Sequence, residues 1–162
     1  MCAVPSDLTA AATILQTAMR LFAERGAASV TIRDIASMAG VSPSLVIHHY
    51  GSKDGLKEAV DLRATALVEA FVGELVDPSR GGAAAPSLAG VFADRLEQVP
   101  VLASYVRRLL VDGGPGAESL FRSLFDATLG GLESLEAVHL VRPAIENRVR
   151  AAFLLVNDLG DC

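Results

Sequence analysis

Two short helical segments separated by a single glycine turn constrain this chain most. Thr31 can cap the first segment through its hydroxyl, and Gly40 can end it, because glycine adopts the left-handed conformation that closes a helix. Ser42 and Pro43 then form a typical helix start, and the second segment runs to about Tyr50. Two short helices joined by such a turn have the spacing of a helix-turn-helix, in which the first helix braces the second.

Helical spacing of apolar residues continues along almost all of the remaining chain. We expect further helices at about 9–25, 53–76, 87–98, 100–111, 116–139 and from 143 to the end, with a Pro- and Gly-rich loop at 77–86. The apolar residues of the helix at 9–25 form a stripe along one face, and Ser52 is expected to cap the helix at 53–76. Gly130 and Gly131 weaken the helix that contains them and can kink or split it. Strict alternation of β-branched residues is absent, so the sequence predicts an all-α fold.

Length and composition indicate one compact unit or two small helical ones. The chain has 162 residues, of which 51% are hydrophobic, and this excludes a disordered chain or a disulfide-rich scaffold. The mean hydropathy of +0.41 is high, yet no apolar run in the sequence reaches the length of about 18 residues that a membrane-spanning helix needs. The N-terminus lacks the features of an export signal, and Cys2 and Cys162 are expected to be free thiols. We therefore expect a cytoplasmic protein with no membrane partner.

The charge balance bears on whether the helix-turn-helix can bind DNA. The net charge of −5 argues against a nucleic-acid partner, but residues 1–60 carry five basic and five acidic side chains, so the negative charge lies beyond them. Residues 35–52 carry no charge at all. Phosphates can still be held by the free ends of the helices that Thr31 and Ser42 begin. Arg33 and Lys53 add cations at the edges of the motif.

Several spaced submotifs within residues 14–60 carry a family resemblance. They are LFAERG at 21–26, TIRDIA at 31–36, AGVS at 39–42, HY at 49–50 and SKDGL at 52–56. This stretch resembles the DNA-binding domain of the TetR family of transcriptional regulators. A run of spaced submotifs is much more specific than a bare helix-turn-helix.

The resemblance implies roles for individual residues in DNA binding. Thr31, Ser42 and Lys53 are expected to hold phosphates, with Arg33 adding a mobile cation. The residues expected to face the major groove are Pro43, Ser44, Leu45 and His48. Leu45 could touch a thymine methyl, and Ser44 or His48 could reach base edges. Ile47 stands where the family often has a tyrosine that donates to phosphate, which removes one expected contact.

The resemblance also implies two domains and a mechanism. Residues 1–52 are expected to form the helix-turn-helix domain, and residues 53–162 a helical domain that binds a small-molecule inducer and forms a homodimer. The function implied is sequence-specific repression at a palindromic operator, relieved when the inducer binds. Members of the family usually continue for one or two more helices, so we expect a C-terminus shortened relative to them. Either part of the dimer interface remains, or the apolar face of the last helix pairs with its copy.

The aromatic side chains are expected in the core, and some can also line the inducer pocket. The candidates are Phe71, Phe92, Tyr105, Phe121, Phe125 and Phe153.

No catalytic set or metal-spaced cluster is visible, and the adjacent His48 and His49 point to different sides of a helix. We therefore predict no enzymatic activity and no cofactor. The alternative is a small all-helical protein that binds a ligand or another protein and whose helix-turn-helix is only structural.

Overall fold

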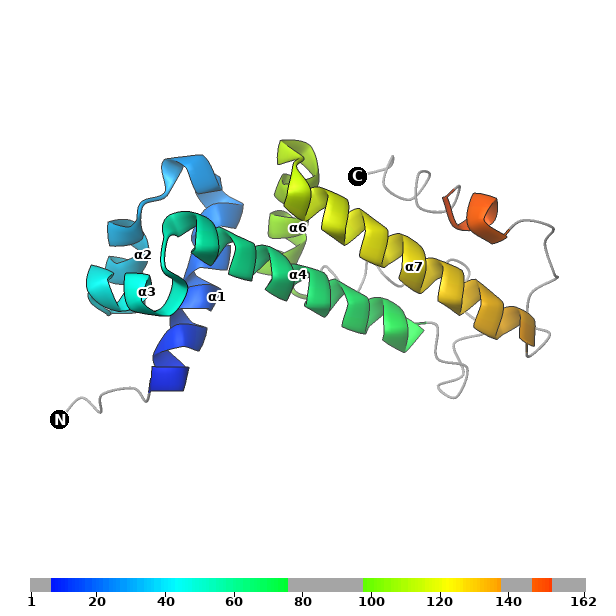
Figure 1. Ribbon diagram of the computed structural model, residues 1–162, viewed down its shortest axis with the longest axis horizontal. Helices are drawn as coiled ribbons and strands as arrows, with labels where there is room; N and C mark the ends of the chain where they lie inside the picture. The colour runs from blue at the N-terminus through cyan, green and yellow to red at the C-terminus, as the bar shows by residue number, and fades with distance from the viewer. Residues whose placement is uncertain (1–6, 76–97, 138–146, 153–162) are drawn as a thin grey trace. The chain divides into compact units, whose positions relative to one another are not determined.

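The computed structural model describes residues 7–75, 98–137 and 147–152, and every regular element among them is a helix (Figure 1). The elements are α1 (Asp7–Arg25), the 3-10 helix η1 (Ala27–Ser29), α2 (Ile32–Ala39), α3 (Pro43–Tyr50), α4 (Lys53–Leu75), α6 (Pro100–Asp112) and α7 (Pro115–Ala137). Residues 147–152 are also helical. The all-α prediction is confirmed, and the helix ends lie within two residues of those expected. The loop at 77–86, most of the helix at 87–98, and Pro143 lie outside the described residues.

The helix that contains Gly130 and Gly131 is not split. Residues 115–137 form a single helix, α7, through both Gly130 and Gly131. A glycine in a helix interior costs about 1 kcal/mol relative to alanine. The buried side chains of Leu124 and Leu132 lie on either side of this pair, so their burial offsets that cost.

Contacts between the helices divide the chain into two compact units. Unit 1 comprises residues 1–64 and 99–116, and unit 2 comprises residues 65–98 and 117–162. The boundary after residue 52, between a DNA-binding domain and a domain for ligand binding and dimerisation, stays a prediction. None of the described helices is long and apolar enough to cross a membrane.

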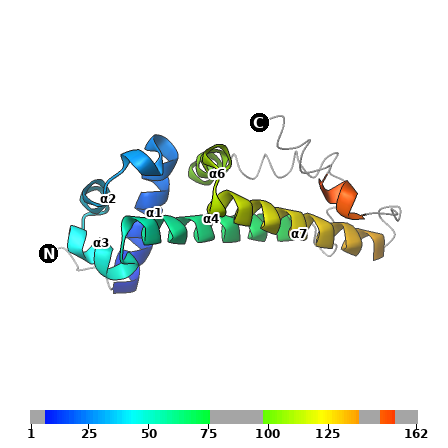
Figure 2. The ribbon, with the colours of Figure 1, turned by 45° about the horizontal axis from the view of Figure 1, so that its top comes forward.

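Unit 1 is built around α1, which packs against α2, α3 and α6. Figures 1 and 2 show α2 and α3 on one side of α1 in both views. The largest fully buried side chains of this unit come from α1, α2, α3, α4, α6 and the segment before α2, and they are Ile14, Leu21, Phe22, Val30, Ile35, Val46, Leu56, Val60 and Leu102. The apolar stripe predicted along the first helix is therefore the centre of the core that holds the helix-turn-helix.

The described part of unit 2 combines the second half of α4 with α7 and residues 147–152. Its buried apolar side chains are Val68 and Val72 on α4, Leu120, Leu124 and Leu132 on α7, and Ala151. The guanidinium carbon of Arg148 lies 5.7 Å from the centre of the Phe125 ring, a distance at which a cation attracts an aromatic face. The amide nitrogen of Asn147 donates to Glu136 at 2.9 Å.

Candidate nucleic-acid interface

The start of α2 is closed by a reciprocal capping box. The Thr31 hydroxyl oxygen accepts from the Asp34 amide at 3.2 Å, while Asp34 Oδ2 accepts from the Thr31 amide at 2.8 Å and from the Thr31 hydroxyl at 2.6 Å. The hydrogen bonds from the Thr31 side chain and backbone hold the pKa of Asp34 below its usual value. Because the Thr31 hydroxyl hydrogen points to Asp34, the donors left for an anion at this end are the amides of Ile32 and Arg33.

Gly40 ends α2 in the way that the sequence predicted. It has φ 69° and ψ 29°, which is the left-handed region, and its amide donates to the carbonyls of Ala36 and Ser37. The Val41 amide donates to Ala36 at 3.0 Å and completes the turn. These bonds satisfy the carbonyls of Ala36 and Ser37, and the chain turns over the three residues from Gly40 to Ser42 before α3 begins.

The start of α3 is capped by Ser42, whose hydroxyl oxygen accepts from the Leu45 amide at 3.2 Å. The Ser42 and Ser44 hydroxyl oxygens are 2.9 Å apart and share a hydrogen bond. Pro43 has no amide hydrogen, so the Ser44 amide is the first donor that this helix end offers to an anion. All three residues at the start of the helix, from Ser42 to Ser44, are exposed.

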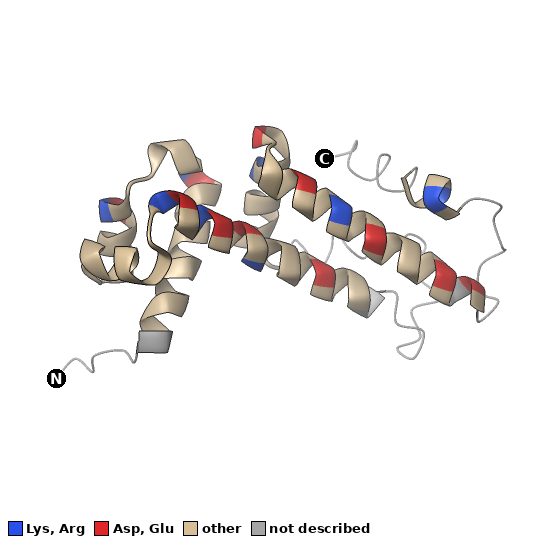
Figure 3. Ribbon diagram, in the orientation of Figure 1, with Lys and Arg blue, Asp and Glu red and all other residues tan. Residues whose placement is uncertain are grey.

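One face of α3 is fixed against α1. Val46 is fully buried, and the Tyr50 hydroxyl donates to the Ala11 carbonyl at 2.8 Å. Burial raises the pKa of Tyr50, so the hydroxyl remains a donor over the ordinary pH range. On the other face, Ser44, Ile47 and His48 are exposed and lie three and four residues apart, which places them together. Figure 3 shows α3 free of charged residues.

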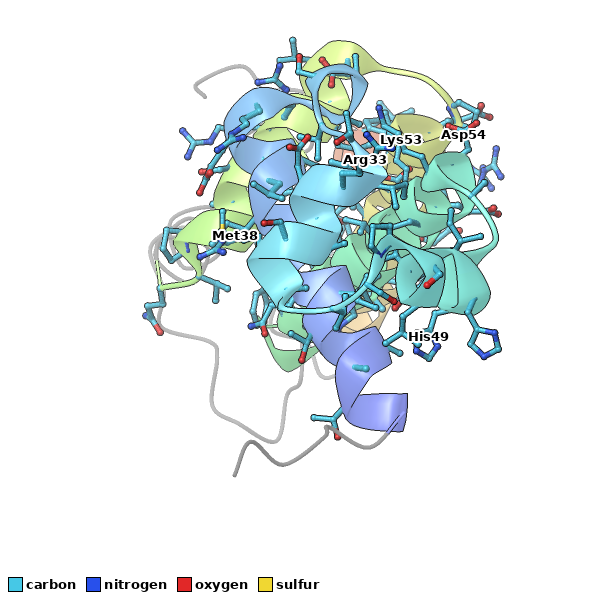
Figure 4. The ribbon with its side chains drawn as sticks, turned by 90° about the vertical axis from the view of Figure 1, so that its left-hand side faces the viewer. Arg33, Met38, His49, Lys53 and Asp54 are labelled. Atoms are coloured by element: carbon cyan, nitrogen blue, oxygen red, sulfur yellow. The ribbon has the colours of Figure 1, made fainter. Side chains whose placement is uncertain are left out.

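The predicted DNA-binding residues lie on α2 and α3, at the N-caps of these two helices, and at the residue that begins α4. Those that the structure leaves exposed are Thr31, Arg33, Ser42, Pro43, Ser44 and His48. Leu45 is only half-exposed. Figure 4 looks onto α2 and α3 and shows Arg33 and Lys53 toward the same edge of this surface. Their contact with DNA stays a prediction.

Lys53 also has a structural contact that the sequence did not indicate. Its ammonium donates to the Ala28 carbonyl in η1 at 3.3 Å, so it ties the start of α4 to the segment before α2. An ammonium has three hydrogens, and two remain for a phosphate.

The turn between α3 and α4 depends on a close approach of two backbone segments. Ser52 caps α4, as predicted, by accepting from the Gly55 amide at 3.0 Å. A side-chain carbon at position 55 would overlap the Tyr50 carbonyl oxygen. Gly55 is therefore required for the angle at which α4 leaves the helix-turn-helix, and only the folded structure shows this.

A polar cluster in unit 1 joins α4 to α6. The Tyr105 hydroxyl donates to Asp61 Oδ1 at 2.5 Å, and the Lys57 ammonium donates to Asp61 Oδ2 at 2.7 Å. Burial, together with the hydrogen bond to Asp61 and its charge, raises the pKa of Tyr105. The four-residue spacing of Lys57 and Asp61 is visible in the sequence, but the partner 44 residues away is not. This cluster, which we name the Asp61 cluster, fixes α6 against α4.

The six pocket candidates stay a prediction, and the structure describes four of them. Tyr105 belongs to unit 1 and its hydroxyl is bound to Asp61, whereas Phe71, Phe121 and Phe125 belong to unit 2. Phe71 and Phe125 are half-buried, and Phe121 is 39% exposed. The other two candidates, Phe92 and Phe153, lie outside the described residues. Within the described ranges, no three His, Cys, Asp or Glu side chains could hold a metal ion.

Two capped helices around a glycine turn, braced by α1 and exposing an uncharged α3 face, form a DNA-binding helix-turn-helix domain. Residues 14–60 match the family of bacterial regulatory proteins called the tetR family. Over 158 residues the chain is 34% identical to the HTH-type transcriptional regulatory protein RaaS of Mycobacterium tuberculosis, and the match covers 96% of this chain and 70% of RaaS. The chain belongs to the TetR family of transcriptional regulators.

Other similar proteins agree with this assignment. The HTH-type transcriptional repressor Rv3405c of Mycobacterium tuberculosis is 56% identical over 50 residues, which are 31% of this chain and 27% of that protein. Among solved structures, SmeT, the repressor of the Stenotrophomonas maltophilia multidrug efflux pump SmeDEF, has a TM-score of 0.72 at 18% identity over 96% of this chain and 78% of SmeT. A gamma-butyrolactone receptor has a TM-score of 0.68 at 23% identity over 94% and 78% of the two chains. At these identities the two structures show the shared fold.

Proposed function

We propose that this chain is a ligand-responsive repressor that binds a palindromic DNA operator as a homodimer in the cytoplasm and has no enzymatic activity. The observation that carries the proposal is the exposed face of α3, which projects from a helix start whose Ser44 amide is open to an anion. Membership of a family of DNA-binding regulators and the likeness to proteins named as repressors support it.

Phosphates are held mainly by backbone amides in this proposal. The donors are the amides of Ile32 and Arg33 at the start of α2 and of Ser44 at the start of α3, where the helix dipoles favour negative charge. The Arg33 and Lys53 side chains add two cations to each subunit. Because so few cations take part, we expect DNA affinity to depend on salt with a shallow slope.

Base edges are read from the outer face of α3 in the major groove. Ser44 and His48 carry the polar groups on this face, and Leu45 contributes a half-exposed alkyl group beside them. Two copies of α3 in a dimer must lie about one helical turn of DNA apart to enter successive major grooves.

Repression is relieved by a small apolar or amphipathic molecule bound in unit 2. A protein similar in fold is described as a gamma-butyrolactone receptor and another as the repressor of a multidrug efflux pump. Phe71, Phe121 and Phe125 supply apolar surface in unit 2 of the kind that lines ligand pockets. A ligand that favours a spacing of the two α3 helices unsuited to the operator must weaken DNA binding reciprocally.

The test is DNA binding by the full chain. A duplex is enriched from a random library, and its affinity is measured by fluorescence anisotropy at several salt concentrations. Lys53→Ala should weaken binding to all duplexes alike and lower the salt slope by about 1, whereas Leu45→Ala should change the preference among duplexes. Arg122→Ala removes an exposed cation from unit 2 and is the matched control, with an unchanged affinity expected.

Two results would contradict the proposal at different levels. A folded chain that binds no duplex at low salt is not a DNA-binding repressor and would support a helical binding protein whose motif is only structural. Equal effects of Lys53→Ala and Leu45→Ala on all duplexes would contradict the division between residues that position the DNA and residues that read it.

A further inference from the structure

The outer face of α3 lacks the side chains that most often read bases. The helix reads Pro-Ser-Leu-Val-Ile-His-His-Tyr, with no arginine or lysine for guanine, no asparagine or glutamine for adenine and no acid for cytosine. Residues 35–52 around it are also without charge. The chemistry available on the outer face is therefore one hydroxyl, one imidazole and alkyl groups.

Ile47 is the most exposed large hydrophobic side chain on this helix. Its side chain is 43% exposed, whereas its neighbour Val46 is fully buried. Ile47 and His48 stand three and four residues after Ser44, so each lies beside Ser44 on the exposed face of α3. Leu45 is half-buried, and its amide is bound to the Ser42 cap.

An isoleucine on a DNA-facing surface has few partners. It has no hydrogen to donate to a phosphate oxygen, and contact with the charged backbone would desolvate that backbone without compensation. The apolar group that DNA presents in the major groove is the C5-methyl of thymine.

We infer that Ile47 determines operator specificity by packing on the C5-methyl of a thymine, so that each half-site requires an A·T pair under this residue. This inference rests on the proposed function and deepens it. Ile47 then replaces a hydrogen bond to the backbone, which carries no sequence information, with an apolar contact that does.

The test removes the methyl group alone. Each thymine of the duplex enriched by the full chain is replaced in turn by deoxyuridine, and the affinities of the wild type and of Ile47→Ala are measured at one fixed salt concentration. At one thymine in each half-site, loss of the methyl should weaken wild-type binding about fourfold, the factor expected for burying one methylene group. Replacing both symmetric thymines should weaken it about fifteenfold, since the two contacts are independent.

In Ile47→Ala the same deoxyuridine replacements should have no further effect, because the partner of the methyl is already absent. Ile47→Val keeps the branched carbon and should retain most of the methyl dependence. Leu62→Ala is the matched control, since it truncates a side chain on α4 that is 62% exposed, and it should keep the full methyl dependence. Both positions are exposed, so the three variants are expected to fold.

Three outcomes overturn the inference. If Ile47→Ala weakens all duplexes alike and the methyl effects remain, Ile47 contacts the sugar backbone. If no thymine methyl affects wild-type binding, apolar reading by this residue is wrong although the proposed function stands. If the folded chain enriches no duplex, the proposed function fails and the inference fails with it.

Discussion

Unit 1 and unit 2 are both helical, but their hydrogen bonds connect different distances along the sequence. In unit 1, Tyr50 binds the Ala11 carbonyl across 39 residues, and Tyr105 binds Asp61 across 44. Lys53 binds the Ala28 carbonyl across 25 residues. Side-chain hydrogen bonds of this range fix helices against one another, so α3, α4 and α6 are each tied to a distant part of unit 1.

The hydrogen bonds that we describe in unit 2 are mostly local. Arg122 and Glu118, Thr128 and the Leu124 carbonyl, and Ser134 and the Gly130 carbonyl are each four residues apart on α7. Such bonds support one helix and do not place it against another. The comparison indicates that side-chain hydrogen bonds fix the geometry of unit 1, as expected of a surface that must match a DNA groove.

The largest expected difference between the units is in the free energy of unfolding that is lost when one carboxylate is removed from each. Asp61→Ala leaves the buried Tyr105 hydroxyl and the Lys57 ammonium without their acceptor and should lower the free energy of unfolding by about 2–3 kcal/mol. Glu118→Ala removes an acid of which about 72% is exposed and should cost less than about 0.5 kcal/mol. Urea denaturation followed by circular dichroism measures both. Equal losses would contradict the comparison.

Two glycines, Gly55 in unit 1 and Gly130 in unit 2, allow a second comparison of the units. Gly55→Ala forces a methyl group into the Tyr50 carbonyl and should lower the free energy of unfolding by about 1–3 kcal/mol, as overpacking does. Gly130→Ala places its methyl group where no atom lies within 4 Å apart from its chain neighbours and the backbone of α7, and it should raise the free energy of unfolding by about 0.5–1 kcal/mol. Thermal denaturation gives the sign of each change directly. If Gly55→Ala raises the melting temperature, the backbone of Gly55 does not lie as close to the Tyr50 carbonyl as described.

The cap of α3 is expected to have a smaller effect. Ser42→Ala removes the acceptor of the Leu45 amide and should cost about 1 kcal/mol, whereas Ser42→Gly should cost a few tenths. The two variants are compared by urea denaturation. Ser134→Ala is the control in unit 2, because its hydroxyl bonds only within α7, and it should leave stability nearly unchanged. If Ser134→Ala lowers the free energy of unfolding as much as Ser42→Ala does, the hydrogen bond from the Leu45 amide to Ser42 is not the cause of the Ser42→Ala effect.

The smallest effect concerns pH. The folded protein holds the pKa of Asp34 below the usual value of 3.8, so the charged carboxylate stabilises the fold above that pH. This contribution is lost as the pH falls below 3.8 and through the lower pKa of the folded state. Melting temperatures of the wild type and Asp34→Asn should therefore differ at neutral pH and converge in acid. A difference that stays constant down to acid pH would exclude the capping box as its source.

Local features of the fold could be predicted from the sequence. The caps at Thr31, Ser42 and Ser52 and the stop at Gly40 each depend on residues within four positions, and the structure confirms all of them. Helix positions followed in the same way from apolar periodicity.

Contacts between distant residues could not be predicted. The bond from Tyr50 to Ala11 and the Asp61 cluster depend on how helices pack, and no local pattern indicates them. The same limit applies to Ile47, whose position in the sequence suggested only a missing contact, while its exposure beside Ser44 and His48 follows from the orientation of α3 on α1. The absence of a break at Gly130 also depended on packing along α7.

The most direct test of the account is hydrogen–deuterium exchange of the full chain with and without the enriched duplex. The account predicts protection of the exposed amides at the starts of α2 and α3, at Ile32, Arg33 and Ser44, and through the rest of α3. It predicts little change along residues 117–137 of α7, which belong to unit 2. Protection confined to α7, with α3 unchanged on a duplex that binds tightly, would contradict the central claim that α3 is the DNA-binding surface.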